Sequence, residues 1–206
     1  MNPILIAFVG VLMLPQFVAS WRLTLFSLSL QGLLMAWISY DLHTSLDSVG
    51  AWIQMFDLAI VRGLAAPIAL YAVLRGQRAS ARHDVIPPNL MSWTLVLVLV
   101  LVAFRFADML LPAGGPDHSF VAAACAGVLL GVLVLSTQTG PFSQMAGALG
   151  IENGIAMFEL RGHHDPAMQI AQTLILVATI LLFRWYLKTL PRASAVKVSA
   201  VEGMHP

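Results

Sequence analysis

The chain has 206 residues, of which 59% are hydrophobic and only 10% are charged, and its formal net charge is +1. A soluble domain carries about 25% charged residues, so this composition, with a mean hydropathy of +0.84, excludes a water-soluble globular protein. The apolar runs are continuous and do not alternate as the strands of an outer-membrane barrel do. We therefore predict an all-α integral membrane protein in the lipid bilayer, and the charge gives no reason to expect a nucleic-acid partner.

Seven apolar segments approach the length of about 20 residues that a helix needs to cross a bilayer. In chain order they cover residues 3–20, 23–40, 51–74, 91–111, 120–136, 142–160 and 167–187. The sixth is weak by hydropathy, so six spans plus a re-entrant segment is the alternative. The first two segments abut so closely that we expect a tight turn at Trp21-Arg22. Residues 1–190 then form one polytopic domain, and residues 191–206 a short tail that we expect to be disordered.

Basic residues indicate the orientation in the membrane. One group lies in the loop after the third segment, and the other closes and follows the seventh. The positive-inside rule places both groups in the cytoplasm. Four spans, an even number, separate them, so the two requirements agree and predict an outside N-terminus and a cytoplasmic C-terminus. The residues concerned are Arg75, Arg78, Arg82, Arg184, Lys188, Arg192 and Lys197.

A carboxylate, Glu152, lies in the glycine-rich sixth segment. A charge at the bilayer centre costs about 2.5–3.5 kcal/mol, and ionisable groups there mark ion or proton paths by default. Glu159 follows two helical turns later, on the same face, and His163 and His164 come next, in the predicted outer loop. We interpret these residues as a ladder of proton-binding groups. The alternative is a structural carboxylate paired with a basic residue on another helix.

Arg62 lies in the middle of the third segment, where an isolated charge needs a partner. Asp57 precedes it by five residues and points about 140° away around a helix of 3.6 residues per turn. A direct bridge within the helix is therefore strained, and Glu152 is the better candidate. Arg62 either tunes the protonation of the neighbouring acid or forms a static ion pair with it. Pro67 follows and is expected to free a backbone carbonyl and to kink the span.

The other polar residues give weaker indications. Arg105 and Asp108, three residues apart near a span end, are expected to pair with each other. Two histidines at 163 and 164 are too few for a metal site. Neither a phosphate-binding loop nor a dinucleotide fingerprint occurs, and we expect no cofactor, no metal and no catalytic site in this chain. Four polar side chains inside spans either line a hydrated path or hydrogen-bond across helices: Gln31, Gln169, Gln172 and Thr173.

Several of these residues together resemble a known family. Ser20-Trp21-Arg22-Leu23 precedes Gln31, Arg62 precedes Pro67 by five residues, and Glu152-Asn153-Gly154 follows a glycine. The order and spacing of these residues, over roughly residues 3–188, are similar to those of hydrogenase-4 component E. That protein is a membrane subunit of formate hydrogenlyase-like and other complex I-related assemblies. Part of its family resembles the K subunit of complex I and the C subunit of multisubunit sodium/proton antiporters.

The resemblance implies a non-catalytic subunit of a respiratory assembly in the inner membrane of a prokaryote, next to antiporter-like membrane subunits. It implies that Glu152 belongs to an intramembrane proton axis and that Arg62 occupies a position that is often basic. The last helix of the family often carries an aspartate, whereas here the seventh segment offers only glutamines and a threonine. The alternatives are a scaffold subunit without its own proton path and a free-standing permease for small solutes.

Overall fold

The computed structural model describes residues 3–42, 49–76, 85–111, 115–160 and 166–189, and these residues are helical almost throughout, with no strand among them. The all-α prediction is confirmed. The predicted tail after residue 190 lies outside the described residues. The helices are α1 (Pro3–Phe17), α2 (Trp21–Leu42), α3 (Val49–Phe56), the π-helix η1 (Asp57–Ala65), α4 (Ala66–Gly76), α5 (Leu90–Leu110), α6 (Pro116–Thr137), α7 (Pro141–Glu159) and α8 (Pro166–Thr189).

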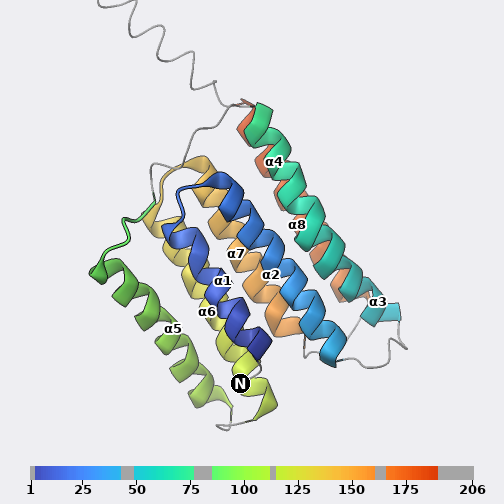
Figure 1. Ribbon diagram of the computed structural model, residues 1–206. Helices are drawn as coiled ribbons and strands as arrows, with labels where there is room; N and C mark the ends of the chain where they lie inside the picture. Colours follow the sequence, from blue (N-terminus) through green and yellow to red (C-terminus); the bar gives the residue numbers. More distant parts are fainter. Residues whose placement is uncertain (1–2, 43–48, 77–84, 112–114, 161–165, 190–206) are drawn as a thin grey trace, which may run out of the picture.

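The helices form an elongated bundle (Figure 1). The centre consists of α1, α2, α6 and α7, while α5 flanks α6 on one side and α4 lies beside α8 on the other. Successive membrane segments alternate in direction, so α4 and α8 both end where the α1–α2 connection lies. Arg75, Arg184 and Lys188, in the last turns of α4 and α8, therefore lie towards the same end of the bundle as the start of α2. Which side of the membrane this end faces stays a prediction.

Five segments are long and apolar enough to cross a membrane: α2, Val49–Gly76, α5, α6 and α8. The protein is therefore a multi-pass membrane protein. The apolar helix α1 has only 15 residues, and α7, with 19, is long enough but is not among the five. The first and the sixth of the seven predicted spans, which correspond to α1 and α7, thus stay predictions.

The connection between the first two helices differs from the prediction. Residues 18–20 form it, whereas Trp21 and Arg22, where the tight turn was expected, already belong to α2. The carbonyl of Ser20 accepts hydrogen bonds from the backbone N–H of Thr24 at 3.0 Å and from its hydroxyl at 3.1 Å. With the Ser20 carbonyl accepting the first bonds of the helix, α2 begins at Trp21, two residues earlier than hydropathy suggested.

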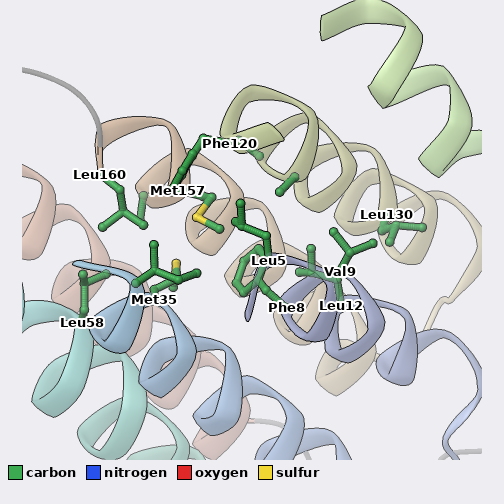
Figure 2. Close-up of a cluster of buried hydrophobic side chains, with 14 of the residues drawn as sticks. Leu5, Phe8, Val9, Leu12, Met35, Leu58, Phe120, Leu130, Met157 and Leu160 are labelled. Carbon is green, nitrogen blue, oxygen red and sulfur yellow. The ribbon is translucent and has the colours of Figure 1, made fainter. Parts of the chain in front are cut away.

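Two clusters of buried hydrophobic side chains hold the bundle together. The first, which we call the α1 cluster, joins α1, α2, η1, α5, α6 and α7 and includes Leu5, Phe8, Met35, Leu58, Met157 and Leu160 (Figure 2). The second, which we call the α8 cluster, joins α2, α4, α7 and α8 and includes Leu25, Leu28, Leu70, Met145, Leu149 and Leu176. Both clusters draw on α2 and α7, so these two helices run through the whole core.

Glycines let α6 and α7 pack backbone against backbone. A Cβ on Gly154 would lie 2.8 Å from the backbone nitrogen of Val128, and one on Gly147 would lie 3.0 Å from the carbonyl of Gly131. A Cβ on Gly150 would meet its nearest neighbour only at 3.8 Å, an ordinary contact. Small residues at such positions are typical of membrane helix pairs. The close approach is found at Gly147 and Gly154 and not at Gly150.

The different surroundings of Gly154 and Gly150 predict different stabilities for two matched variants on α7. Gly154→Ala forces a methyl group into the α6 backbone, and overpacking of this kind costs about 1–3 kcal/mol. At about 2–4 °C per kcal/mol for a chain of this size, the melting temperature in detergent should fall by at least about 2 °C. Gly150→Ala serves as the control, with little or no loss. Equal melting temperatures for the two variants would contradict the packing described here.

Candidate functional site

The third membrane segment, Val49–Gly76, changes from an α-helix to a π-helix and back again. Between α3 and α4 it forms η1, in which backbone N–H groups bond to carbonyls five residues earlier, as Ala66 N–H does to the carbonyl of Val61. Pro67 lacks an N–H, and its ring crowds the carbonyl four residues earlier, which is that of Gly63. The hydroxyl of Ser29 on α2 donates to this carbonyl instead. Pro67 therefore cannot give the carbonyl of Gly63 the bond that an α-helix would, and Ser29 bonds this carbonyl from α2.

The π-helix brings Asp57 and Arg62 together. Arg62 Nε donates to Asp57 Oδ2 at 2.8 Å, and the two side chains are 3% and 12% exposed. The expectation that this bridge would be strained, and that Glu152 would be the partner of Arg62, was wrong. It assumed 3.6 residues per turn, whereas the wider turn of a helix with five-residue hydrogen bonds brings residues five apart closer to the same face.

Arg62 also connects η1 to α7. Its Nη1 donates to the backbone carbonyl of Glu152 at 3.0 Å and to Oδ1 of Asn153 at 3.4 Å. The Glu152 side chain itself is half-buried, and its carboxylate forms no ion pair with any residue in the described ranges. Arg62 therefore lies next to Glu152 without neutralising its carboxylate.

A chain of hydrogen bonds continues from Asn153 across two more helices. Asn153 Nδ2 donates to Gln31 Oε1 at 3.0 Å, and Gln31 Nε2 donates to the hydroxyl of Ser27 at 3.4 Å. The hydroxyl of Ser27 then donates to the carbonyl of Val11 at 2.8 Å. Because a guanidinium can only donate, Arg62 orients every amide in this chain. Gln31 thus hydrogen-bonds across helices, as one of its two predicted roles required.

These side chains form one polar layer between the two hydrophobic clusters. On α2, on the third membrane segment and on α7, the polar residue has a member of the α1 cluster on one side along the helix and a member of the α8 cluster on the other. The triplets are Leu28, Gln31 and Met35; Leu58, Arg62 and Ala66; and Leu149, Asn153 and Met157. The layer is therefore enclosed by apolar packing on both sides, which excludes bulk water and strengthens its electrostatic interactions.

A second group of polar side chains lies where α7 ends. The helix is continuous through Pro141–Glu159, so Glu152 and Glu159 are two turns apart on one helix, as predicted. Gln54 on α3 accepts from the hydroxyl of Ser39 at 3.2 Å and donates to the carbonyl of Glu159 at 3.5 Å.

The polar residues predicted on the last span divide between two environments. Gln169 and Gln172 line a small cavity together with Asp57 and Glu159. The hydroxyl of Thr173, in contrast, donates to the carbonyl of Gln169 within its own helix, at 3.0 Å. The structure therefore joins two of the three to the carboxylates and leaves Gln31 in the separate layer around Arg62.

The remaining predictions concern residues outside this site. Arg105 pairs with Asp108 at 3.7 Å, as expected, and His118 contacts the same carboxylate at 2.7 Å. Arg105 and Asp108 are exposed near the end of α5, whereas the His118 side chain, near the start of α6, is mostly buried. His163 and His164 lie outside the described residues. Within the described part of the chain, no three side chains of His, Cys, Asp or Glu gather as ligands for a metal ion.

Sequence reasoning missed several members of the site. Asn153 entered only through the family resemblance, although it links Arg62 to Gln31. Ser27 lies four residues before Gln31, and Gln54 lies three residues before Asp57, so each shares a helix face with a recognised residue. That spacing was the available signal.

Comparison with models of protein families, with curated proteins and with solved structures finds no match. The resemblance to hydrogenase-4 component E stays a prediction that depends on the residues quoted for it.

The buried ion pair between Asp57 and Arg62 predicts non-additive stability losses in a double-mutant cycle. Asp57→Asn and Arg62→Gln should each destabilise the protein by about 3–5 kcal/mol, because each leaves the other charge buried without its partner. The double variant should lose less than the sum of the two. Arg105→Gln is the control, since an exposed pair contributes about 0–1 kcal/mol. Melting temperatures of the purified variants measure these effects, and additive losses at 57 and 62 would contradict a direct pair.

Proposed function

We propose that this chain is a membrane subunit of a complex I-related respiratory assembly and contributes Glu152 to a proton-translocating axis. The observation that best supports the proposal is the Arg62–Asp57 ion pair, buried inside a multi-pass bundle and bonded to the backbone of Glu152. Ionisable groups inside a membrane protein are costly and mark ion or proton paths by default. The proposed location is the inner membrane of a prokaryote, with the N-terminus outside and the C-terminus in the cytoplasm.

Each charged residue has a distinct role in this proposal. Glu152, half-buried and without an ion-pair partner in the described structure, takes up and releases the proton. Arg62 supplies a permanent positive charge beside it, and Asp57 holds Arg62 in place. Glu159 is the next acceptor along α7, two turns after Glu152 on the same helix. The chain needs no cofactor for this role.

The outer helices provide surfaces for partner subunits. Large apolar side chains are exposed along α5 and α8, among them Leu97, Leu101, Leu174, Leu182 and Trp185. Inside a membrane such faces contact either lipid or other helices. In the proposed assembly, antiporter-like subunits cover part of them.

A scaffold role is the second candidate, and one observation favours it. Arg62 is satisfied by Asp57, a backbone carbonyl and an amide, and does not bond the carboxylate of Glu152. Such an arrangement also fits a static polar layer that fixes how the helices pack. A free-standing permease is the third alternative, and it requires transport by the purified chain alone in liposomes.

Co-purification tests the assembly. The tagged chain, extracted from its own membrane in a mild detergent, should retain large antiporter-like subunits that mass spectrometry identifies. A chain that purifies alone and transports solutes in liposomes would overturn the proposal in favour of the permease.

Glu152→Gln tests the proton role. The substitution preserves the shape of the side chain and removes its titratable group, so proton uptake by membrane vesicles containing the assembly should slow by about tenfold or more. Asp108→Asn, which removes an exposed carboxylate at the end of α5, is the control and should leave uptake unchanged. Unchanged uptake in Glu152→Gln contradicts the relay, and a loss of assembly without a coupling defect supports the scaffold.

A further inference from the structure

A small polar cavity lies between the end of α7 and the start of the third and last membrane segments. Its volume is about 20 Å³. Two of its lining residues are apolar, and the other five carry carboxylate or amide groups. The lining consists of Leu58, Ala156, Gln54, Asp57, Glu159, Gln169 and Gln172.

The lining includes a buried carboxylate oxygen that is unsatisfied. Asp57 is only 8% exposed, and its Oδ2 bonds Arg62, but its Oδ1 is buried and has no hydrogen-bond partner among the described residues. Buried polar atoms in folded proteins almost always have a partner, and ordered water is a common one. The unpaired oxygen belongs to a residue of the cavity wall, so the cavity is the place from which a partner can reach it.

The size of the cavity fits one water molecule. A water needs about 10–15 Å³ and two to four polar partners, and 20 Å³ leaves too little room for a second. The lining is a poor cage for a cation. Arg62 already neutralises Asp57, and the oxygen of Gln54 accepts from Ser39 while its amide nitrogen donates to the carbonyl of Glu159.

We propose that one water molecule occupies this cavity and links Asp57 Oδ1 to the carboxyl group of Glu159, so that the two acids share a proton. In the transfer, the O–H bond of protonated Glu159 breaks as its proton passes to the water. The water in turn releases one of its own protons, which forms the O–H bond on Asp57 Oδ1. The water is regenerated and the total charge is unchanged. This step deepens the proposed function, because it gives Glu159 an acceptor other than Glu152.

The direct test is whether experimental density shows a water molecule in the cavity. A high-resolution structure of the intact assembly should show one peak in the cavity, about 2.5–3.0 Å from Asp57 Oδ1. An empty cavity, or a protein group bonded directly to that oxygen, would overturn the proposal.

A double-mutant cycle tests the link in solution. Asp57→Asn, Glu159→Gln and the double variant are compared by melting temperature. A bridging water makes the double variant lose less than the sum of the single losses, by at least about 2 °C. Plain repulsion between two carboxylates gives the opposite sign, because either substitution alone relieves it. Additivity, or the opposite sign, overturns the bridge.

Two controls complete the test. One asks whether the cavity holds a water or a cation, and the other asks whether the coupling is specific to this pair of residues. Replacing choline chloride by sodium chloride at constant ionic strength should leave the melting temperature unchanged, and a saturable rise would show a cation in place of the water. The cycle Asp57→Asn with Asp108→Asn should be additive, since Asp108 is at the exposed end of α5. The water bridge and the proposed function can be contradicted independently of each other. Coupling between Asp57 and Glu159 can persist when Glu152→Gln leaves proton uptake unchanged, and it can be absent when uptake falls.

Discussion

The buried guanidinium of Arg62 is the constraint on which the rest of the site depends. A guanidinium cannot lose its proton in a protein, so the fold has to surround it with acceptors from several helices. Asp57 can reach it only because η1 is wound as a π-helix, and α7 contributes both a backbone carbonyl and the amide of Asn153. The position of α7 against the third segment is thus fixed by hydrogen bonds, whereas hydrophobic packing alone has no comparable directional preference.

Glycines determine the distance over which these bonds form. A Cβ on Gly32 would lie 2.5 Å from the backbone nitrogen of Gly63, so α2 and η1 meet backbone to backbone beside Gln31 and Arg62. Gln31 and Arg62, which lie next to this contact on the two helices, both bond the Asn153 amide on α7. The polar layer and the close helix contacts therefore depend on each other. A wider spacing would leave buried amides unpaired in a low-dielectric interior, where such groups are costly.

The sequence predicts the helices well and the winding of one of them poorly. Long apolar runs mark most membrane segments, and the three-residue spacing of Arg105 and Asp108 correctly predicts a pair. The partner of Arg62 was missed because a period of 3.6 residues was applied to a segment in which Pro67 disrupts it. Proline five residues after a buried arginine, and an aspartate five before it, was the local signal. The donors and acceptors of the polar layer come from four helices, and no local pattern specifies such distant contacts.

The chemistry of the layer limits where a proton can travel. Asn153 and Gln31 carry amide groups, which do not release protons under ordinary conditions, so the chain from Arg62 to Val11 orients dipoles and does not conduct. Proton exchange in this region requires carboxyl groups, and these lie on the other side of Arg62, towards the end of α7. Because the layer is closed by apolar clusters on both faces, a path that begins at Glu152 meets no titratable successor among the described residues in the direction of Gln31. Under the proposed function, that part of the path belongs to neighbouring subunits.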